Sequence, residues 1–293
     1  MIGPGVRVAV TGASGFCGGY VARGARALGA DVVCLGRRPG PEGTRHVRWD
    51  AAAGPPDLSG ADVVVHLAAA VGDPASGRLA ERAFHAINVE GARRLLDAAG
   101  GRPVVWVSSG SVYRAHDGVV TEDHPVDGQR TAYGRTKAAG ERLALSAGAV
   151  VLRPRAVYGH GDPHLLPRLR RAVRRGVIRL PGPDTLLSLT AVENLADACL
   201  RAYAWPAGPY NIADAAPYPR NETIARVLPG VRVREVPVPV ALAAAALRAG
   251  GVTRYAVEQL AYGLVLDIDR ARAQGWEPAR DLGDFLHHAE PTG

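Results

Sequence analysis

A short run of β-branched residues, Val6–Val10, ends in a glycine-rich segment, and a helical pattern begins directly behind it. Glycines at a strand-to-helix turn let the backbone approach a pyrophosphate, whose charge lies at the positive end of the helix. The glycine spacing is weak evidence alone, but its position between strand and helix is the context that the motif requires. We therefore predict a dinucleotide site here rather than a ligand-free turn. Its cofactor-binding residues are predicted to be Gly12, Ser14, Gly15, Phe16, Cys17 and Gly18.

Strand and helix patterns alternate over roughly the first 155 residues. The predicted strands are Val6–Val10, Asp31–Leu35, His46–Trp49, Val63–Leu67, Val104–Val107 and Val150–Leu152, and the predicted helices are Phe16–Leu28, Leu79–Ala99 and Ala132–Ala147. This alternation is typical of an α/β protein with a Rossmann-type, doubly wound parallel sheet. Prolines interrupt the later pattern. We expect a cofactor-binding domain over residues 1–155, to which some later segments return, and mainly a smaller substrate-binding lobe over residues 156–293.

The end of the second predicted strand bears on the identity of the cofactor. An acidic residue at this position would bind the ribose hydroxyl of NAD. Here the strand ends in Leu35-Gly36-Arg37-Arg38. Glycine leaves room, and Arg37 and Arg38 can bind a 2′-phosphate by charge-assisted hydrogen bonds. NADP is therefore preferred over NAD, and an ordinary basic loop is the alternative.

Composition argues against several other classes of protein. The net charge is +7, but the arginines are spread along the chain without a basic tail, so we expect no nucleic-acid partner. The longest apolar stretch, Val236–Leu247, contains two prolines and is too short to span a bilayer. It would form either a pocket wall or a core helix. No signal segment precedes the first strand, so we expect a cytoplasmic protein without a membrane partner.

Two further groups of residues receive structural interpretations. Arginines are dense between Arg168 and Arg179, a pattern that suits the solvated side of an amphipathic helix, with an anion site as the less favoured alternative. Cys17, Cys34 and Cys199 lack disulfide or metal spacing. We interpret them as small buried hydrophobic residues and predict no metal.

The only lysine among the 35 basic residues Lys and Arg is Lys137, and it follows Tyr133 by four positions in a predicted helix. Residues at this spacing share a helix face. The ammonium favours the phenolate, so it would lower the pKa of Tyr133 and make the hydroxyl a general acid or base. Tyr-x-x-x-Lys is common by chance, and an ordinary surface pair is the alternative reading.

Several short motifs in order make the chain similar to the extended short-chain dehydrogenase/reductase family. The motifs are Thr11–Gly18, His66-Leu67-Ala68-Ala69, Asn88-Val89-Glu90-Gly91, Val107–Tyr113, Tyr133-x-x-x-Lys137, Arg153–Gly159, and Asp267-Ile268-Asp269 with Gly275-Trp276-Glu277-Pro278. The family includes nucleotide-sugar epimerases and dehydratases, 3β-hydroxysteroid-type dehydrogenases and carbonyl reductases. The resemblance covers nearly the whole chain and implies a cofactor domain with a carboxyl-terminal substrate lobe.

The resemblance also implies individual roles. Ser109 would be the catalytic hydroxyl, Tyr133 the proton donor or acceptor, and Lys137 the residue that binds the nicotinamide ribose and tunes Tyr133. The further cofactor residues would be Asp50 at the adenine, Leu67, Ala68 and Ala69 at the adenosine and ribose, Pro154 and Val157 beside the nicotinamide, Asn88 in support of the site, and Ser108. His66, Ser108 and Ser111 are also consistent with purely structural roles.

The resemblance separates the candidate reactions only in part. Family dehydratases have an acidic pair after the catalytic hydroxyl, whereas Gly110 and Ser111 follow Ser109 here. Nucleotide-sugar enzymes commonly have an asparagine where Ala156 stands, although Arg155 or the Arg168–Arg179 arginines could bind phosphate instead. We therefore expect an NADP-dependent carbonyl reductase or alcohol dehydrogenase for a small or medium organic molecule. The alternatives are a nucleotide-sugar 4-ketoreductase or epimerase, and a non-catalytic NADP-binding protein; a homodimer through the helix of Tyr133 is common in the family.

Overall fold

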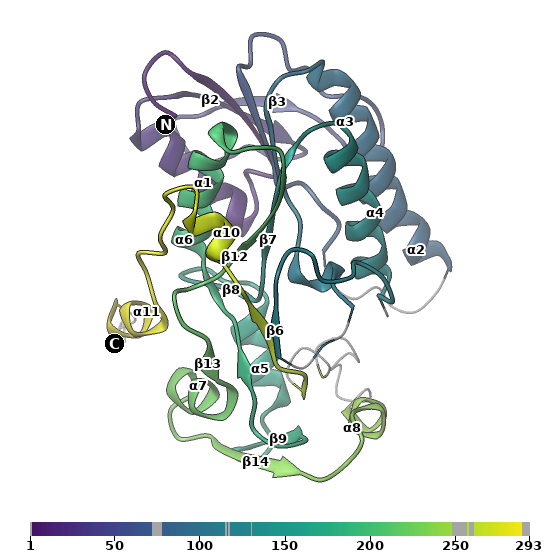
Figure 1. Ribbon diagram of the computed structural model, residues 1–293, viewed down its shortest axis with the longest axis vertical. Coiled ribbons are helices and arrows are strands. Elements are labelled where there is room, and N and C mark those ends of the chain that lie inside the picture. The colour runs from purple at the N-terminus through teal and green to yellow at the C-terminus, as the bar shows by residue number, and fades with distance from the viewer. Residues whose placement is uncertain are drawn as a thin grey trace.

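The computed structural model of the chain describes residues 2–71, 78–114, 116, 118–129, 131–247, 257 and 261–288. Its centre is a seven-stranded sheet in which all neighbouring strands are parallel (Figure 1). In spatial order the strands are β3 (Arg45–Arg48), β2 (Asp31–Gly36), β1 (Arg7–Thr11), β4 (Val63–His66), β5 (Val104–Val107), β7 (Val150–Pro154) and β12 (Gly208–Ile212). This confirms the predicted Rossmann-type sheet, in which the carboxyl ends of the strands share one edge.

Two layers of helices cover the sheet, because successive side chains of a strand point to opposite faces. Val8 and Val10 of β1 pack in the apolar cluster that holds α1 and α6, whereas Ala9 packs with α3 and α4. Figure 1 shows α1 and α6 on one side of the sheet and α2, α3 and α4 on the other. The bounds are α1 (Phe16–Ala27), α2 (Arg78–His85), α3 (Gly91–Ala99), α4 (Ala132–Ser146) and α6 (Val192–Arg201).

The helix predicted over residues 79–99 contains a wider turn. A π-helical segment, η1 (Ala86–Glu90), joins α2 to α3 and carries the buried Asn88. Helix α4 packs closely on this segment, because a Cβ on Gly140 would lie 3.5 Å from the backbone carbonyl carbon of Asn88. Wide turns of this kind occur often at functional sites.

The rest of the chain forms small elements around the carboxyl edge of the sheet. The two-stranded sheets pair β8 (Val157–Tyr158) with β11 (Thr190–Ala191), β9 (Val177–Pro181) with β14 (Arg232–Val236), β10 (Leu186–Leu187) with β13 (Tyr218–Pro219), and β6 (Gly118–Val120) with β15 (Leu264–Leu266). The helices here are η2 (Gly110–Val112), α5 (Leu165–Ala172), α7 (Arg220–Val227), α8 (Val240–Leu247), α10 (Asp269–Arg272) and α11 (Leu282–His288). A short helix, η3 (Ala202–Ala204), follows α6 and leads into the start of β12. Strand β12 and helix α6 belong to the main sheet layers, so the later chain returns to them. The division at residue 155 stays a prediction.

The prediction of one helix across Arg168–Arg179 is wrong. Helix α5 ends at Ala172, and β9 begins at Val177. Between them Arg175 has φ +51°, a left-handed conformation that interrupts a helix. Strand β9 shows an alternation of buried and exposed side chains, because Ile178 and Leu180 are buried and Arg179 between them is exposed. The apolar residues next to Arg179 therefore belong to a strand and not to a helix.

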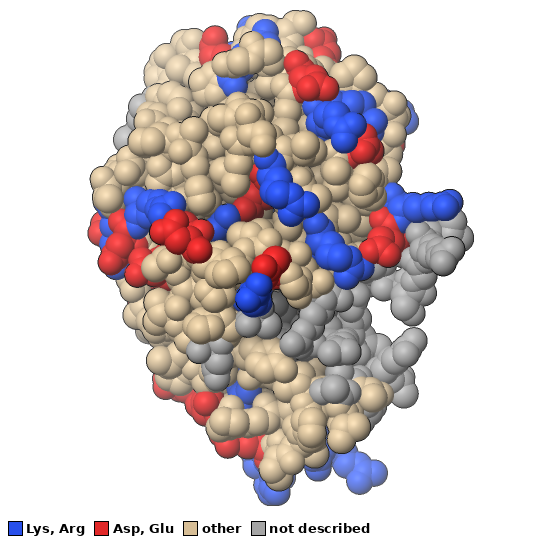
Figure 2. All heavy atoms as spheres, turned by 45° about the vertical axis from the view of Figure 1, so that its right-hand side comes forward, with Lys and Arg blue, Asp and Glu red and all other residues tan. Residues whose placement is uncertain are grey.

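On the face shown in Figure 2, acidic and basic residues are interspersed among uncharged ones. In α8, Ala243 is buried and Leu242 is 63% exposed. The choice between a pocket wall and a core helix for this segment stays open. Cys34 and Cys199 are buried as predicted, whereas Cys17 is partly exposed. No helix among the described residues has the length and apolarity to cross a membrane.

Candidate active site

The glycine-rich turn has the close backbone contacts that a dinucleotide site requires. Gly12 has φ +71°, and a Cβ there would lie 2.8 Å from the amide nitrogen of Ala68. A Cβ on Gly18 would lie 2.7 Å from the carbonyl carbon of Gly12. Neither position can therefore carry a side chain unless the backbone moves. Ser14 and Gly15 are exposed where α1 begins, so the turn lies at the surface at a helix N-terminus, a position that suits a pyrophosphate.

The loop after β4 is bound to this turn by one hydroxyl. Thr11 Oγ1 accepts hydrogen bonds from the amides of Leu67 and Ala68, each at 3.1 Å, and lies 2.8 Å from Nδ1 of His66. Leu67, Ala68 and Ala69 are partly exposed. Burial, and then the charge of Lys137, lower the pKa of His66 to about 3, so its ring is neutral. The hydrogen bond between His66 and Thr11 therefore supports a structural role for His66.

The predicted 2′-phosphate residues lie beside this turn. The amide of Gly12 donates to Leu35 O at 3.1 Å, which places the end of β2 next to the turn. Arg37 and Arg38 follow and are exposed. Arg48, also exposed, stands in register with Gly36 and adds a guanidinium that the sequence analysis missed. Only the pairing of β2 with β3 could have revealed it.

Three predicted cofactor residues have side chains engaged with protein. Asp50 is exposed and accepts a hydrogen bond from the amide of Ala52 at 3.0 Å. The Asn88 amide group bonds to both backbone groups of Ala70 and donates to Thr136 Oγ1 at 3.0 Å. Ser108 is 4% exposed and donates to a carboxylate described below. Direct cofactor contacts of these three side chains stay predictions.

Ser109 and Tyr133 come from two turns that pack together. Ser109 caps η2, and its Oγ accepts from the amide of Ser111 at 3.1 Å. A Cβ on Gly134 would lie 2.9 Å from Ser111 O, so the first turn of α4 rests directly on η2. Tyr133, the residue before Gly134, is partly exposed. The fold therefore brings the turns of the two predicted catalytic residues into contact.

Lys137 lies one helical turn below Tyr133 and is 4% exposed. Its Nζ donates to Val107 O at 2.6 Å and lies 5.6 Å from the centroid of the Trp106 ring. Burial lowers the pKa of Lys137 to about 8, and the nearby Glu141 carboxylate opposes that shift. A compact ammonium fits this site at the end of β5, whereas a planar guanidinium would not.

Behind Lys137 lies a buried ion pair. Glu141, one turn further along α4, accepts two hydrogen bonds from Arg153 of β7, at 3.1 and 2.5 Å, and the two side chains are 1% and 3% exposed. Its other oxygen accepts the hydroxyl hydrogen of Ser108. The pair therefore connects α4 to the ends of β5 and β7.

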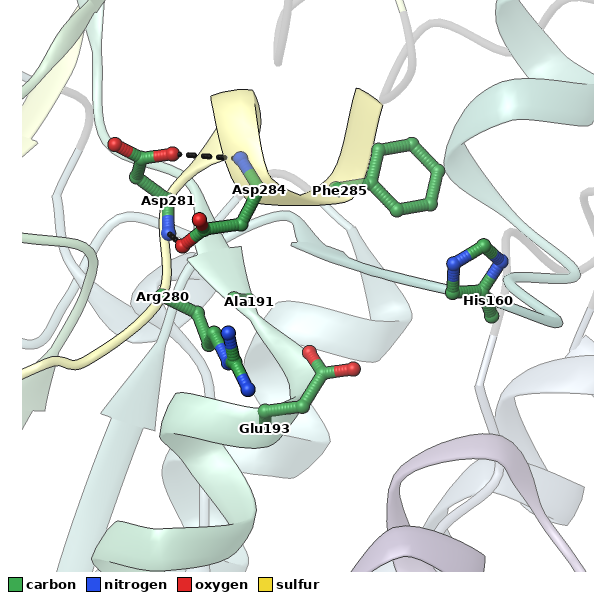
Figure 3. A pocket seen from close by; sticks show the side chains of 7 residues that line it. All are labelled: His160, Ala191, Glu193, Arg280, Asp281, Asp284 and Phe285. Atoms are coloured by element: carbon green, nitrogen blue, oxygen red, sulfur yellow. Dashed lines mark hydrogen bonds between the residues drawn. The ribbon is translucent and has the colours of Figure 1, made fainter. Parts of the chain in front are cut away.

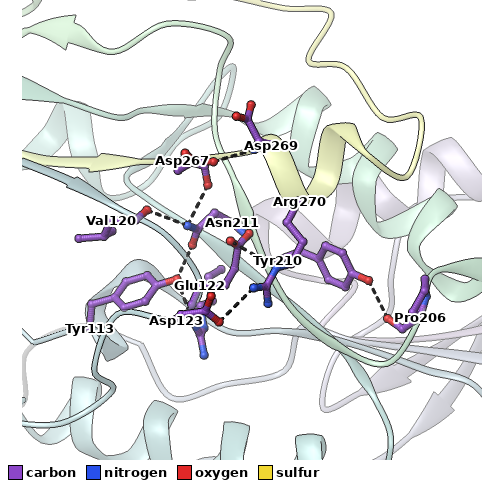
Figure 4. Close-up of polar contacts among 11 residues, drawn as sticks. Tyr113, Val120, Glu122, Asp123, Pro206, Tyr210, Asn211, Asp267, Asp269 and Arg270 are labelled. Atoms are coloured by element: carbon purple, nitrogen blue, oxygen red, sulfur yellow. Dashed lines mark hydrogen bonds and ion pairs between the residues drawn. The ribbon is translucent and has the colours of Figure 1, made fainter.

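Hydrogen bonds continue from Arg153 to Tyr113, and Figure 4 shows the network from Tyr113 to Arg270. Arg153 donates to Tyr113 OH at 2.9 Å, and Tyr113 donates to Asn211 Oδ1 at 2.5 Å. Asn211 in turn donates from its backbone amide to Glu122 at 2.7 Å, and Glu122 lies 3.7 Å from the half-exposed Arg270. Burial raises the pKa of Tyr113 to about 12, so it stays protonated in this network.

Pro154 and Val157 stand on either side of a strained residue. Pro154 ends β7, Val157 begins β8, and Ala156 between them has φ +44°. Alanine rarely adopts this conformation, which asparagine adopts more readily. Arg155 is buried and donates from Nη2 to Tyr262 O at 3.3 Å.

A separate hollow of about 180 Å³ lies between the start of α6 and the carboxyl-terminal segment (Figure 3). Its lining residues are His160, Ala191, Glu193, Arg280, Asp281, Asp284 and Phe285. Asp281 and Asp284 each accept the backbone amide hydrogen of the other, at 2.9 and 3.1 Å, which caps α11. None of the predicted site residues lines it. Among the described residues, no group of His, Cys, Asp or Glu is arranged to hold a metal ion.

Comparison with known proteins places this site in a family. Residues 8–213 match the model of the NAD dependent epimerase/dehydratase family. The chain is 30% identical over 261 residues to a 2-alkyl-3-oxoalkanoate reductase of Stenotrophomonas maltophilia, covering 77% of this chain and 76% of the relative. It is 31% identical to 4-hydroxy-2-methyl-3-oxo-4-farnesyl-3,4-dihydroquinoline-1-oxide ketoreductase of Stigmatella aurantiaca, with 98% of each chain covered.

A solved structure, MoeE5 in complex with UDP-glucose and NAD, superimposes with a TM-score of 0.75 at 28% identity, over 97% of this chain and 96% of that one. The chain therefore belongs to the NAD dependent epimerase/dehydratase family, within the extended short-chain dehydrogenases/reductases. It is an NAD(P)-dependent enzyme of that type.

Proposed function

We propose that the protein is an NADP-dependent carbonyl reductase, or in reverse an alcohol dehydrogenase, for a small or medium organic substrate. One observation carries the proposal. The only lysine of the chain is buried against Val107 O at the end of β5 and lies one helical turn from Tyr133. This is an arrangement for hydride chemistry with a phenol as acid or base.

The cofactor, when bound, supplies or accepts the hydride. The Gly12–Gly18 turn would hold its pyrophosphate, and Lys137 would bind the nicotinamide ribose. Tyr133 and Ser109 donate hydrogen bonds to the substrate carbonyl oxygen and so polarise it. As negative charge develops on that oxygen, Tyr133 transfers its proton, and the ammonium of Lys137 stabilises the tyrosinate that remains.

The preference for NADP rests on charge at the end of β2. Arg37, Arg38 and Arg48 are exposed there, and the Gly36 position lacks a carboxylate that would bind a free ribose hydroxyl. The similar solved structures contain NAD, so the preference is a property that we propose for this chain. We also propose that residues 1–155 bind the cofactor and residues 156–293 mainly the substrate, and that the protein forms a homodimer through α4.

The names of both relatives support reduction of a carbonyl group, since one is an oxoalkanoate reductase and the other a ketoreductase. Ala156 at the strained position supports the same substrate class, because it offers no side-chain donor to a diphosphate.

A nucleotide-sugar 4-ketoreductase or epimerase is the second candidate. Its support is the similarity over nearly the whole chain to MoeE5, which was solved with UDP-glucose and NAD. In that case Arg155 or the exposed arginines of α5 would have to bind the diphosphate.

The test compares NADPH with NADH, following absorbance of the reduced cofactor against a panel of ketones and β-keto acids. Replacing both Arg37 and Arg38 by Ala should weaken NADPH binding by roughly 10- to 100-fold and leave NADH binding nearly unchanged, since each charged hydrogen bond contributes about 1.5–3 kcal/mol before solvent screening at exposed sites. Arg45→Ala, at the opposite end of β3, is the matched control. Equal losses for both cofactors would reject the 2′-phosphate site. Tightly retained NAD together with binding of UDP-sugars would favour the second candidate.

A further inference from the structure

The Glu141 carboxylate supports the positive charge of Lys137. Charged and titratable groups that face this lysine come from three elements: Glu141 and Tyr133 on α4, His66 on β4, and, behind Glu141, Arg153 on β7. The His66 ring is neutral. The contact from β5 is the uncharged carbonyl of Val107. Among the described residues, Glu141 is therefore the only group whose negative charge acts on the ammonium.

The carboxylate of Glu141 is also held in place from several sides. Arg153 binds one oxygen through Nε and Nη2, and Ser108 donates to the other oxygen. Ser108 directly follows Val107, the partner of Lys137, and directly precedes Ser109. Val107 accepts the hydrogen bond of Lys137, and the neighbouring Ser108 binds the Glu141 carboxylate. Both the lysine and its supporting carboxylate are therefore bound to the end of β5.

We propose that Glu141 is a positioning residue of this active site, whose buried carboxylate keeps Lys137 protonated and holds it, through Ser108, in register with Ser109. The inference rests on the proposed function, because it gives a role to the lysine of that site. Glu141 would have this electrostatic role in addition to its ion pair with Arg153. The carboxylate offsets part of the cost of burying the ammonium, so that the lysine remains charged when Tyr133 loses its proton.

The chain offers a direct measurement, because Lys137 is its only lysine. Full-length protein labelled with carbon-13 at lysine Cε gives one lysine Cε resonance, and its chemical shift against pH gives the pKa of Lys137 without any turnover. The wild-type midpoint should lie at about 8. Glu141→Gln should lower it by about one pH unit, the smaller end of the effect of a neighbouring charge. Glu141→Asp, which keeps the charge, should restore most of the difference.

Ser108→Ala is the matched control, since it removes a hydrogen bond to the same carboxylate but no charge. Its lysine midpoint should stay at the wild-type value. If Glu141→Gln titrates at the wild-type midpoint, or if Ser108→Ala shifts it as far, the proposal is wrong. Should Glu141→Gln not fold, the double variant Glu141→Gln with Arg153→Gln leaves no unpaired charge. Compared with Arg153→Gln alone it should titrate at lower pH, and equal midpoints in these two variants would reject the proposal equally.

Kinetics separate this inference from the proposed function. If both hold, the alkaline limb of the pH profile of kcat for ketone reduction moves to lower pH in Glu141→Gln by the same amount as the lysine midpoint. A shifted lysine midpoint with an unshifted kcat profile would support the role of Glu141 toward Lys137 and reject the role of Lys137 in turnover.

Discussion

Replacing Arg153 by Met tests whether the buried pair holds this region together. Methionine keeps much of the side-chain volume but removes the two hydrogen bonds to Glu141 Oε1, the bond to Tyr113 OH at 2.9 Å and the bond to Glu122 O at 3.0 Å. Glu141 is 1% exposed, so water cannot replace the lost partner. Removing one partner of a buried pair costs about 3–5 kcal/mol.

This loss is large against the stability of about 5–15 kcal/mol that is usual for a folded domain. With a urea dependence of about 3 kcal/mol per molar, the unfolding midpoint of Arg153→Met should fall by about 1 M or more. Urea titrations followed by far- and near-ultraviolet circular dichroism would measure it, and coincident curves would justify a two-state treatment.

The matched control is the surface pair of Arg201 with Asp197, where Nε and Oδ2 are 2.9 Å apart and the side chains are 39% and 44% exposed. Arg201→Met should lose about 0.3–0.5 kcal/mol, as exposed pairs at this helix spacing do. Replacing both buried partners, Glu141→Leu with Arg153→Met, should recover most of the stability that the single variant loses, because no charge is left unpaired. An Arg153→Met variant as stable as the Arg201→Met control would refute the argument from burial.

Three further predictions concern the site. Tyr133→Phe should abolish turnover while NADPH still binds, as measured by fluorescence titration; retained turnover would reject its role as proton donor. Lys137→Arg should also lose turnover although the charge is kept, since a guanidinium cannot occupy the small site beside Val107 O, and activity near the wild-type rate would contradict this. Gly18→Ala should lower cofactor affinity at least tenfold, or about 1.4 kcal/mol, because its Cβ would lie 2.7 Å from the carbonyl carbon of Gly12, and calorimetry that found unchanged affinity would contradict the close approach.

Local sequence patterns were sufficient for six of the seven strands of the main sheet, and β12 was not predicted. The β-branched runs predicted β1, β2, β4, β5 and β7 to within a residue or two at their ends, because each is a short, buried strand with a clear boundary. The pattern failed around Arg175, where a left-handed residue and Gly176 separate a helix from a strand of similar composition. Hydrophobic periodicity over so few residues does not distinguish the two.

Site residues that lie close together in the sequence could be predicted, whereas a residue that strand pairing brings to the site could not. Gly12, Gly18, Tyr133 and Lys137 were proposed from spacing within one turn or one helix, and their roles stay predictions. Arg48 was missed because only strand pairing brings it beside Gly36.

Glu141 carried a sequence signal that was not used. It follows Lys137 by four positions, as Lys137 follows Tyr133, so all three share one face of α4. Its partner Arg153, twelve positions further on, could not be assigned without the position of β7.

The charges buried behind the site bear on the proposed role of Tyr133. Lys137 and Arg153 contribute two positive charges and Glu141 one negative charge, while His66 is neutral. Among these four side chains one positive charge is uncompensated, and the buried carboxylate of Glu122 lies further along the network, beside Arg270. In a buried environment that excess favours any anion formed next to it far more than water would. A tyrosinate at Tyr133 would supply the missing negative charge. The same positive charge that makes Lys137 costly to bury would therefore lower the free energy of the state after proton transfer.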